Sequence, residues 1–173
     1  MNAGAMGGST FDLVESVRVM DASGRVSEWP RQSLEARYRE CPALRERIAV
    51  GAALRGRPDS PEPIQRRMDE FSRRRRSTQP AASSAGCAFK NPAAIPAGRL
   101  IEELGLKGAR VGGASVSLEH GNFIVNDRGA TARDILELMA LIGERARVER
   151  GIELEREVEV IGEDAAEAVM NGP

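Results

Sequence analysis

The residue types best suited to chemistry gather in one short segment, Ala85–Pro92, which holds a thiol, an ammonium group and a carboxamide. These groups belong to Cys87, Lys90 and Asn91. The segment is bounded by Gly and Pro, which favour loops, and loops on a rigid frame often carry functional groups. Taken alone, a cysteine such as Cys87 is more often an inert small residue than a reactive thiol, and the nearby Lys90 and Asn91 shift this balance only moderately.

Further polar positions in the second half could complete a site. Lys107 follows a helix-stop pattern, where its ammonium could bind a phosphate or carboxylate, or could only complement a helix dipole. Asn122 and Asn126 flank an apolar run, and His120 is the one His of the sequence. Because a single His with no Cys/His ligand spacing cannot build a multi-His metal centre, we predict no metal ligands.

Two further patterns admit either a structural or a functional interpretation. The run from Asn2 to Gly8 is permissive backbone that could lie against a ligand, although it lacks the spacing of a dinucleotide fingerprint. Near the carboxy terminus, glutamates alternate with apolar residues at Glu153, Glu155, Glu157 and Glu159. A strand over residues 152–161 with a solvated outer face explains such alternation.

Composition excludes several classes of function. The chain has 173 residues, 41% of them hydrophobic, which is enough for one domain or two small ones. A net charge of -1, with four Phe, one Tyr and one Trp, argues against nucleic acid as a partner. No apolar run approaches the ~20 residues of a membrane span. With two cysteines and no secretion signal, we expect a cytoplasmic protein with free thiols.

The first half of the sequence predicts a hairpin over residues 12–29 and a strand over Ile48–Leu54. After a Pro-rich break, the spacing of Ile64, Met68 and Phe71 predicts a helix from residue 64 to 76 that ends in four arginines. We interpret these arginines as a solvated helix end. Small and polar residues from Ser77 to Ser84 then predict a linker, with a domain boundary near residue 80.

The second half predicts a loop through Pro96, a short helix over residues 98–104, and short strands between residues 111 and 126. A capping box at Thr131–Asp134 predicts the start of a longer helix that runs to about Arg147. With the strand expected over residues 152–161, the order of elements is typical of an α+β domain.

Several short motifs occur together in a specific order along nearly the whole chain. They are Met1–Ala5 with Gly7-Gly8, Tyr38-Arg39, Gln79-Pro80, Gly86–Pro92, Ala97–Ile101, Gly105–Gly108, Gly112–Ala114 with Val116-Ser117, and Leu154–Val158 with Ile161-Gly162. In this order and spacing the chain resembles the UDP-N-acetylenolpyruvoylglucosamine reductase (UDP-N-acetylmuramate dehydrogenase) family, the flavoenzymes of peptidoglycan precursor synthesis.

The resemblance implies an oxidoreductase in which NADPH reduces FAD and the reduced flavin passes a hydride to the enolpyruvyl ether of a UDP-sugar. It implies roles for seven residues: Cys87 as proton donor, Arg39 and Glu157 as catalytic partners that hold and polarise the substrate carboxylate, Asn91 and Lys107 in substrate binding, and Gly4 and Ala5 close to the flavin. Many members have Ser at the position of Cys87, which keeps a donor of different acidity.

The resemblance also implies a domain division. Residues 1–57 are expected to be the remainder of a flavin-binding α+β domain, residues 58–80 a helix and linker, and residues 81–173 a small α+β substrate-binding domain. In full-length members a glycine-rich flavin-binding region precedes the position matched by Met1. The alternative hypotheses are a redox-inactive UDP-sugar-binding module and a fragment without function. Oligomeric state stays open.

Overall fold

A computed structural model describes residues 2–162, and the chain divides into two compact units. The first unit comprises residues 1–71 and the second residues 72–173, so the division falls inside helix α1 (Pro61–Thr78). The expected division has boundaries at residues 57 and 80 and treats this helix as a separate connector. These boundaries stay a prediction. The end of the expected substrate-binding domain, from 163 to 173, lies outside the described residues.

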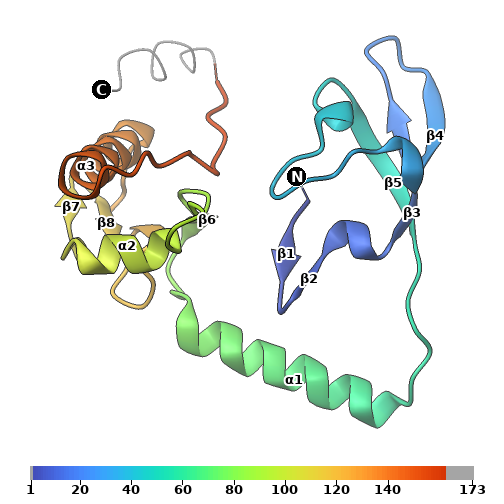
Figure 1. Ribbon diagram of the computed structural model, residues 1–173, viewed down its shortest axis with the longest axis horizontal. Helices are drawn as coiled ribbons and strands as arrows, with labels where there is room; N and C mark the ends of the chain where they lie inside the picture. The colour runs from blue at the N-terminus through green and yellow to red at the C-terminus, as the bar shows by residue number, and fades with distance from the viewer. Residues whose placement is uncertain (1, 163–173) are drawn as a thin grey trace. The chain divides into compact units, whose positions relative to one another are not determined.

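The first unit is built on a three-stranded antiparallel sheet in the order β4-β3-β5 (Figure 1). Its strands are β3 (Val14–Met20), β4 (Val26–Pro30) and β5 (Ile48–Leu54), so the predicted hairpin and third strand are confirmed. A small hairpin, β1 (Gly4–Ala5) and β2 (Gly8–Ser9), precedes them, and short 3-10 turns occupy Thr10–Asp12, Arg31–Ser33 and Pro42–Leu44. The buried core comprises Phe11, Val14, Val17, Val19, Leu34 and Cys41.

The turn of the β3–β4 hairpin is closed by the carboxylate of Asp21, which accepts hydrogen bonds from the backbone N–H groups of Ser23 at 2.9 Å and Arg25 at 3.1 Å. Side chains of Asp that bond to backbone groups ahead of them are a common means of fixing turns. This local hydrogen bonding explains why the turn could be predicted from the sequence.

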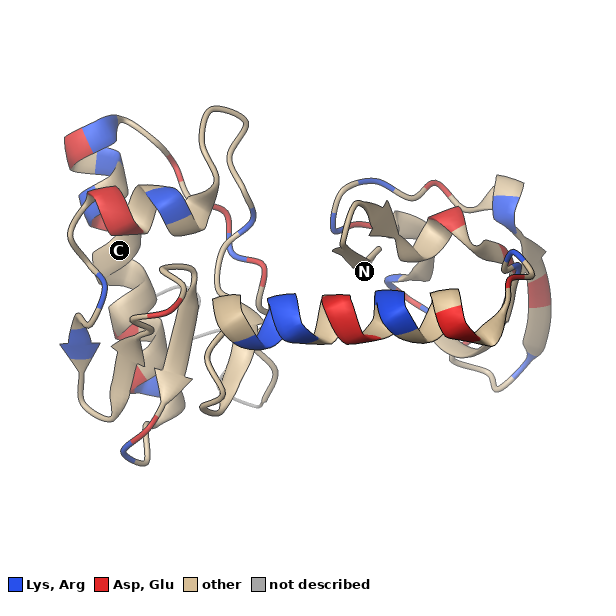
Figure 2. Cartoon of the chain, turned by 90° about the horizontal axis from the view of Figure 1, so that it is seen from below, with Lys and Arg blue, Asp and Glu red and all other residues tan. Residues whose placement is uncertain are grey.

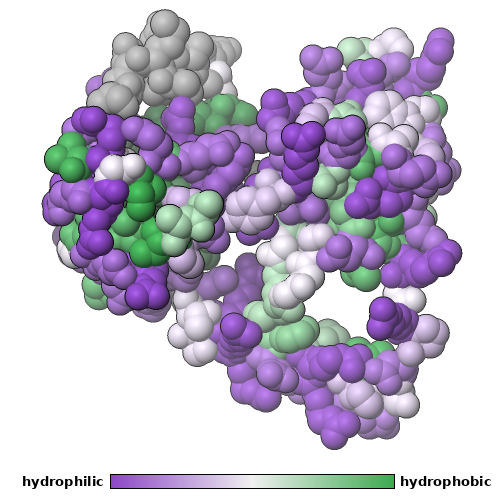
Figure 3. Space-filling model, viewed as in Figure 1, coloured by the Kyte–Doolittle hydropathy of each residue, from purple (hydrophilic) through white to green (hydrophobic). Residues whose placement is uncertain are grey.

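Helix α1 confirms the predicted helix and extends it by a few residues at each end. Its apolar side chains Ile64, Met68 and Phe71 are 37%, 57% and 41% exposed. Charged residues of both signs occur along the helix in Figure 2, and Figure 3 shows many hydrophilic residues on the face in view. The last turn contains Arg75 and Arg76. A cationic last turn complements the negative end of the helix dipole, which agrees with the interpretation of the arginines as a solvated helix end.

The second unit is an α+β domain with a four-stranded antiparallel sheet in the order β6-β9-β8-β7. The strands are β6 (Ser84–Cys87), β7 (Arg110–Val111), β8 (Ala114–Val116) and β9 (Phe123–Asn126). Helices α2 (Ala97–Glu103) and α3 (Ala132–Arg150) share one core with this sheet, to which they contribute Leu100, Ile101, Leu138 and Ile142. The two helices predicted for this half are therefore confirmed.

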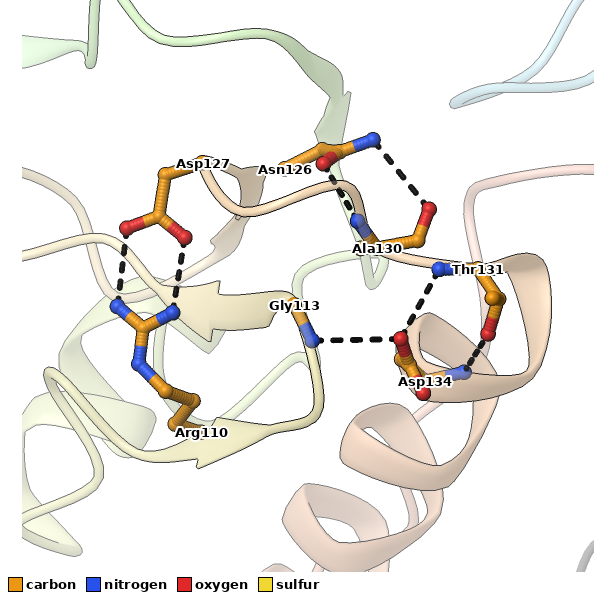
Figure 4. Close-up of polar contacts among 7 residues, drawn as sticks. All are labelled: Arg110, Gly113, Asn126, Asp127, Ala130, Thr131 and Asp134. Atoms are coloured by element: carbon orange, nitrogen blue, oxygen red, sulfur yellow. Dashed lines mark hydrogen bonds and ion pairs between the residues drawn. The ribbon is translucent and has the colours of Figure 1, made fainter.

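The start of α3 is tied to the sheet by the carboxylate of Asp134 (Figure 4). Thr131 accepts a hydrogen bond from the Asp134 N–H, and the Asp134 carboxylate accepts from the Thr131 N–H at 2.9 Å, which completes the predicted capping box. The same carboxylate accepts from the Gly113 N–H at 3.3 Å. A Cβ on Gly112 would lie 2.5 Å from this carboxylate, so only Gly fits in the β7–β8 turn.

Two segments differ from their sequence-based predictions. The first is Ser84–Cys87, expected as part of a linker and loop, which forms the edge strand β6. The second is the run of residues 152–161, expected as a strand, which makes only one isolated β-bridge, between Arg156 and Phe89. Alternation of apolar and charged residues fixes the exposure of the side chains but does not supply a neighbouring strand, so it cannot by itself make a ladder.

Within residues 2–162, none of the helices combines the length and the apolar character needed to cross a membrane.

Candidate functional site

Cys87 is the last residue of β6, where its Cα is paired with that of Phe123 on β9. The side chain is partly buried, and Gly86 before it adopts a φ of 86°. Immediately after Cys87, the Ala88 N–H donates to the backbone oxygen of Asn122 at 2.8 Å. The thiol is thus carried by a strand end that is fixed on both sides, rather than by the free loop that the sequence suggested.

Glu157 is brought close to Cys87 along the backbone, because its N–H donates to the carbonyl of Ala88 at 2.9 Å. Two residues earlier, the Glu155 carbonyl accepts from the Lys90 N–H at 2.8 Å, and the Glu155 carboxylate forms an ion pair with the Lys90 ammonium. These contacts attach the carboxy-terminal segment to the segment that follows β6. Two of the predicted catalytic residues therefore lie on neighbouring, hydrogen-bonded segments of the second unit.

Glu157 also differs in burial from the other glutamates of its segment. It is half-buried, whereas Glu153, Glu155 and Glu159 are exposed. A carboxylate that is partly withdrawn from solvent interacts more strongly with nearby charges than an exposed one does. The exposure of the other three agrees with the solvated face predicted for them.

Asn91 and Lys107 lie near opposite ends of α2. The Asn91 side-chain oxygen accepts from the Ala97 N–H at 3.0 Å, so it satisfies one of the free donors at the start of the helix. The Lys107 ammonium follows the end of the helix and forms an ion pair with Glu102 at 2.9 Å. Asn91 thus has a structural contact in addition to its predicted role, and Lys107 has an anionic partner that a phosphate would have to compete with.

The surroundings of Lys107 include two ionisable groups of the loop between β8 and β9. The pKa of Glu119 is lowered, mainly by a hydrogen bond from the Ser117 hydroxyl and in small part by the Lys107 charge. The pKa of His120 is also lowered, mainly because burial penalises the charged imidazolium. Its Nδ1 accepts from the Asn122 N–H at 3.1 Å, which leaves Nε2 as the protonated nitrogen of the neutral ring.

In the first unit, the structure brings Arg39 close to the glycine-rich turn. A Cβ on Gly4 would lie 3.5 Å from the Arg39 guanidinium and 3.1 Å from the Gly8 carbonyl oxygen, so Gly4 allows close approach here. Both Gly4 and Ala5 are exposed.

Arg39 itself has an unusual backbone conformation. It lies in a two-residue turn closed by reciprocal hydrogen bonds between Arg37 and Glu40, and its φ is 55°. Its guanidinium carbon lies 5.2 Å from the centre of the Tyr38 ring. A residue other than Gly in this conformation costs free energy, and such strain concentrates at functional sites.

The arrangement of the second unit matches a known family. Residues 79–161 match the domain described as UDP-N-acetylenolpyruvoylglucosamine reductase, C-terminal domain. The chain is 43% identical to the UDP-N-acetylenolpyruvoylglucosamine reductase of Syntrophomonas wolfei over 166 residues, and 44% identical to that of Prochlorococcus marinus over 171 residues. Residues 79–161 belong to the C-terminal domain family of the UDP-N-acetylenolpyruvoylglucosamine reductases, and the chain is similar to these reductases over 95% of its length.

A solved structure agrees with this assignment. The crystal structure of UDP-N-acetylenolpyruvylglucosamine reductase from Thermus caldophilus matches with a TM-score of 0.82 and 43% sequence identity, over 94% of this chain and 58% of the other. The Syntrophomonas and Prochlorococcus matches cover 95% of this chain, but 56% and 55% of the relatives. The chain therefore spans a little over half the length of the curated reductases it matches.

The matched domain contains four of the predicted site residues: Cys87, Asn91, Lys107 and Glu157. Arg39, Gly4 and Ala5 lie in the first unit, outside the range of the domain match. Sequence reasoning singled out Asn122 without giving it a role, yet its contacts hold the segment that follows Cys87. Asn122 directly precedes the apolar strand β9, and a polar side chain next to a buried strand needs a hydrogen-bonding partner. This position in the sequence could have pointed to a structural role for Asn122.

A cavity of about 470 Å³ in the second unit is lined in part by β6. Its walls come from β6, β9, α3 and the segment of residues 158–161, and they include Ile124, Ile135, Met139 and Val158. Among the described residues that line it there is no Lys or Arg, so it offers no countercharge for a diphosphate. The described lining of the cavity therefore lacks a cation suited to a phosphate, and a site formed by Cys87, Glu157 and Lys107 stays a prediction. In residues 2–162, no three His, Cys, Asp or Glu side chains are arranged as metal ligands.

Proposed function

We propose that the chain carries the catalytic and substrate-binding residues of a cytoplasmic, flavin-dependent reductase that converts the enolpyruvyl ether of a UDP-N-acetylglucosamine into UDP-N-acetylmuramate. The observation that carries the proposal is the pairing of the Ala88 carbonyl with the Glu157 N–H, because it places a carboxylate-bearing residue next to the strand end that bears Cys87. The family assignment of residues 79–161 supports it.

In this proposal Cys87 is the proton donor. The reduced flavin would supply the hydride, which adds to the methylene carbon of the enolpyruvyl group, while NADPH restores the reduced state. The thiol of Cys87 gives its proton to the neighbouring carbon, and the resulting thiolate regains a proton from solvent. Since the thiol must stay protonated until that step, its surroundings should not strongly lower its pKa.

Arg39 and Glu157 are the proposed catalytic partners that hold and polarise the substrate carboxylate. Addition of a hydride to the double bond places negative charge on the carboxylate end of the substrate. A guanidinium is permanently charged and can stabilise that charge in the transition state, and the half-buried side chain of Glu157 can orient the substrate there. The strained backbone of Arg39 is what a residue held for such a role would show.

Lys107 and Asn91 are the proposed substrate-binding residues. The ammonium of Lys107 is flexible, and its ion pair with the exposed carboxylate of Glu102 is of a weak class that a phosphate can displace. Asn91 accepts from the Ala97 N–H, which fixes the direction of its side chain at the start of α2.

The residues of the first unit suit part of a flavin site. Gly4 and Ala5 are exposed, and a Cβ on Gly4 would make a tight contact of 3.1 Å with the Gly8 carbonyl oxygen. A flat ring system can approach such backbone closely. We therefore assign Gly4 and Ala5 to contact with FAD, with Arg39 as the nearest cation.

The proposal is tested by joining the amino-terminal part of the Syntrophomonas reductase to this chain and following NADPH oxidation with the UDP-sugar substrate. Cys87→Ala should lower kcat by about 10³-fold or more, because general acid catalysis contributes of this order. Cys87→Ser keeps a hydroxyl donor and should retain measurable turnover. Equal turnover in the parent and Cys87→Ala proteins would remove Cys87 from the mechanism.

A second candidate function is binding of the UDP-sugar without redox chemistry. It is favoured by the second unit, which has its own core and carries Asn91 and Lys107. In calorimetric titration of the chain as it stands, the UDP-sugar should release heat in the absence of flavin. If binding is seen only after FAD and the joined amino-terminal part are present, the separate binding function is excluded.

A further inference from the structure

Asn122 is a polar residue in the turn before β9 whose side chain is 2% exposed. A buried carboxamide is costly unless its donors and acceptor are bonded. The Asn122 side-chain oxygen accepts from the Phe89 N–H at 3.0 Å, and its amide group donates to the Phe89 carbonyl at 2.7 Å. Asn122 therefore binds both backbone polar groups of one residue, two positions after Cys87.

These contacts hold the residues that follow β6, at a point where the neighbouring strand β9 no longer pairs with them. The last paired residues of β6 and β9 are Cys87 and Phe123, and the chain turns at Asn122. There the Asn122 backbone oxygen accepts from the Ala88 N–H, and the Asn122 side chain replaces a strand in binding Phe89. Cys87 therefore lies between the β6–β9 pair on one side and, on the other, the two side-chain hydrogen bonds from Asn122 to Phe89, which form the Asn122 clamp.

The clamp also reaches Glu157 and His120. The Ala88 carbonyl, which lies between Cys87 and Phe89, accepts from the Glu157 N–H, so a shift of this segment would move Cys87 and Glu157 together. On the other side, the Asn122 N–H donates to Nδ1 of His120.

We propose that Asn122 is a positioning residue that fixes the direction of the Cys87 thiol and, through Ala88, the place of Glu157. This inference rests on the proposed function for its importance in catalysis. Catalytic groups must be held near their productive geometry by neighbours whose own contacts are saturated, and small displacements are costly in rate. Asn is suited to this position because Asp lacks the donor that Phe89 requires, and Leu would leave both Phe89 groups unsatisfied.

The chain offers a matched control at the other end of β9. The Asn126 side chain makes the same pair of contacts with one residue, since it accepts from the Ala130 N–H at 2.7 Å and donates to the Ala130 carbonyl at 3.4 Å (Figure 4). Removing either amide breaks a side-chain clamp beside the same strand. Only the clamp of Asn122 acts on the residues that follow Cys87.

The experiment measures alkylation of Cys87 by iodoacetamide as a function of pH, in a Cys41→Ala background so that one thiol reacts. In Asn122→Ala we expect the limiting rate to change by about fivefold or more and the midpoint of the pH profile to shift, because the surroundings and direction of the thiol change. In Asn126→Ala we expect the parental profile. Circular dichroism and the urea midpoint of each variant are measured alongside.

Parental pH profiles in both variants would overturn the proposal, and so would equal changes in both, which indicate general loosening of β9. If Asn122→Ala does not keep its helical signal, Asn122→Ser takes its place under the same outcomes, since its hydroxyl can still bond one Phe89 group. The readout needs neither flavin nor UDP-sugar. Unchanged alkylation in Asn122→Ala would therefore reject the positioning role without rejecting the proposed function. Unchanged turnover in Cys87→Ala would reject the proposed function without rejecting the contacts of Asn122.

Discussion

Single residues of the candidate site are distinguished by how the backbone around them is held. Glu157 shares an alternating segment with three other glutamates, yet it is the one that is half-buried, and its N–H is bonded to the residue after Cys87. Arg39 is set apart by a left-handed backbone. The bond of Glu157 depends on a segment distant in the sequence, and the local turn that holds Arg39 contains no Gly, Asn or Asp to signal a left-handed residue. Only the family resemblance therefore pointed to these residues.

Replacement of Lys107 by Gln should weaken binding of the UDP-sugar by about tenfold, because a charge-assisted hydrogen bond to phosphate is lost. The urea midpoint should change little, because the Lys107–Glu102 ion pair is partly exposed. Calorimetric titration at low and high salt measures the effect.

Arg99→Gln is the matched control for Lys107→Gln, since Arg99 forms an exposed ion pair with Glu103 on the same helix, α2. Its affinity for the UDP-sugar should equal that of the parent. If both variants lose affinity equally, the effect reflects the net charge of the region rather than a contact made by Lys107.

At the scale of elements, the sequence predicts structure well where the determinants are local. The β3–β4 hairpin, α1, α2 and α3 follow from turn residues, helical spacing and a capping box. The strand β6 was missed because Ser84, Ala85 and Gly86 have little strand preference, and its partner β9 lies more than thirty residues away. Residues 152–161 were expected as a strand for the opposite reason, since their alternation is strong but they have only one bridge.

The capping box of α3 predicts how much the free energy of unfolding falls when the Thr131 hydroxyl is removed. Thr131→Ala should lower the free energy of unfolding by about 1 kcal/mol, because the Asp134 N–H then lacks its acceptor. Thr131→Ser keeps the hydroxyl and should stay close to the parent. Urea unfolding followed by circular dichroism measures both, and equal stability of the Ala and Ser variants would contradict the role of the cap.

Asp134 predicts a dependence of stability on pH. Hydrogen bonds from the Thr131 and Gly113 N–H groups lower the pKa of its carboxyl below the usual 3.8. Since the pKa is lower in the folded state, the carboxylate adds stability above the unfolded value, and this contribution is lost as pH falls through the folded pKa. Asp134→Ala should therefore be less stable than the parent at ~pH 6, and the gap should narrow towards ~pH 2.5. A gap that stays constant over this range, measured by urea unfolding, would argue against the ionised carboxylate as its source.

At the scale of the whole molecule, the two units have cores of different size. Among residues 2–162, six buried residues form the core of the first unit and fourteen form the core of the second. Strand β5 of the first unit also exposes large apolar side chains, with Ile48 59% and Leu54 62% exposed. Because stability rises with the apolar surface buried on folding, the first unit should be the less stable of the two.

This difference can be measured with one protein and two signals. Trp29 is the one Trp of the chain and packs against the core of the first unit, while helices α2 and α3 of the second unit contribute strongly to the far-ultraviolet circular dichroism. We expect the Trp fluorescence midpoint at a urea concentration about 1 M lower than the dichroism midpoint, because the two transitions are separate. Val19→Ala should lower only the first midpoint and Leu100→Ala only the second, each through the loss of about 1–4 kcal/mol in one core. Coincident transitions that shift together in both variants would show instead that the two units unfold as one cooperative structure.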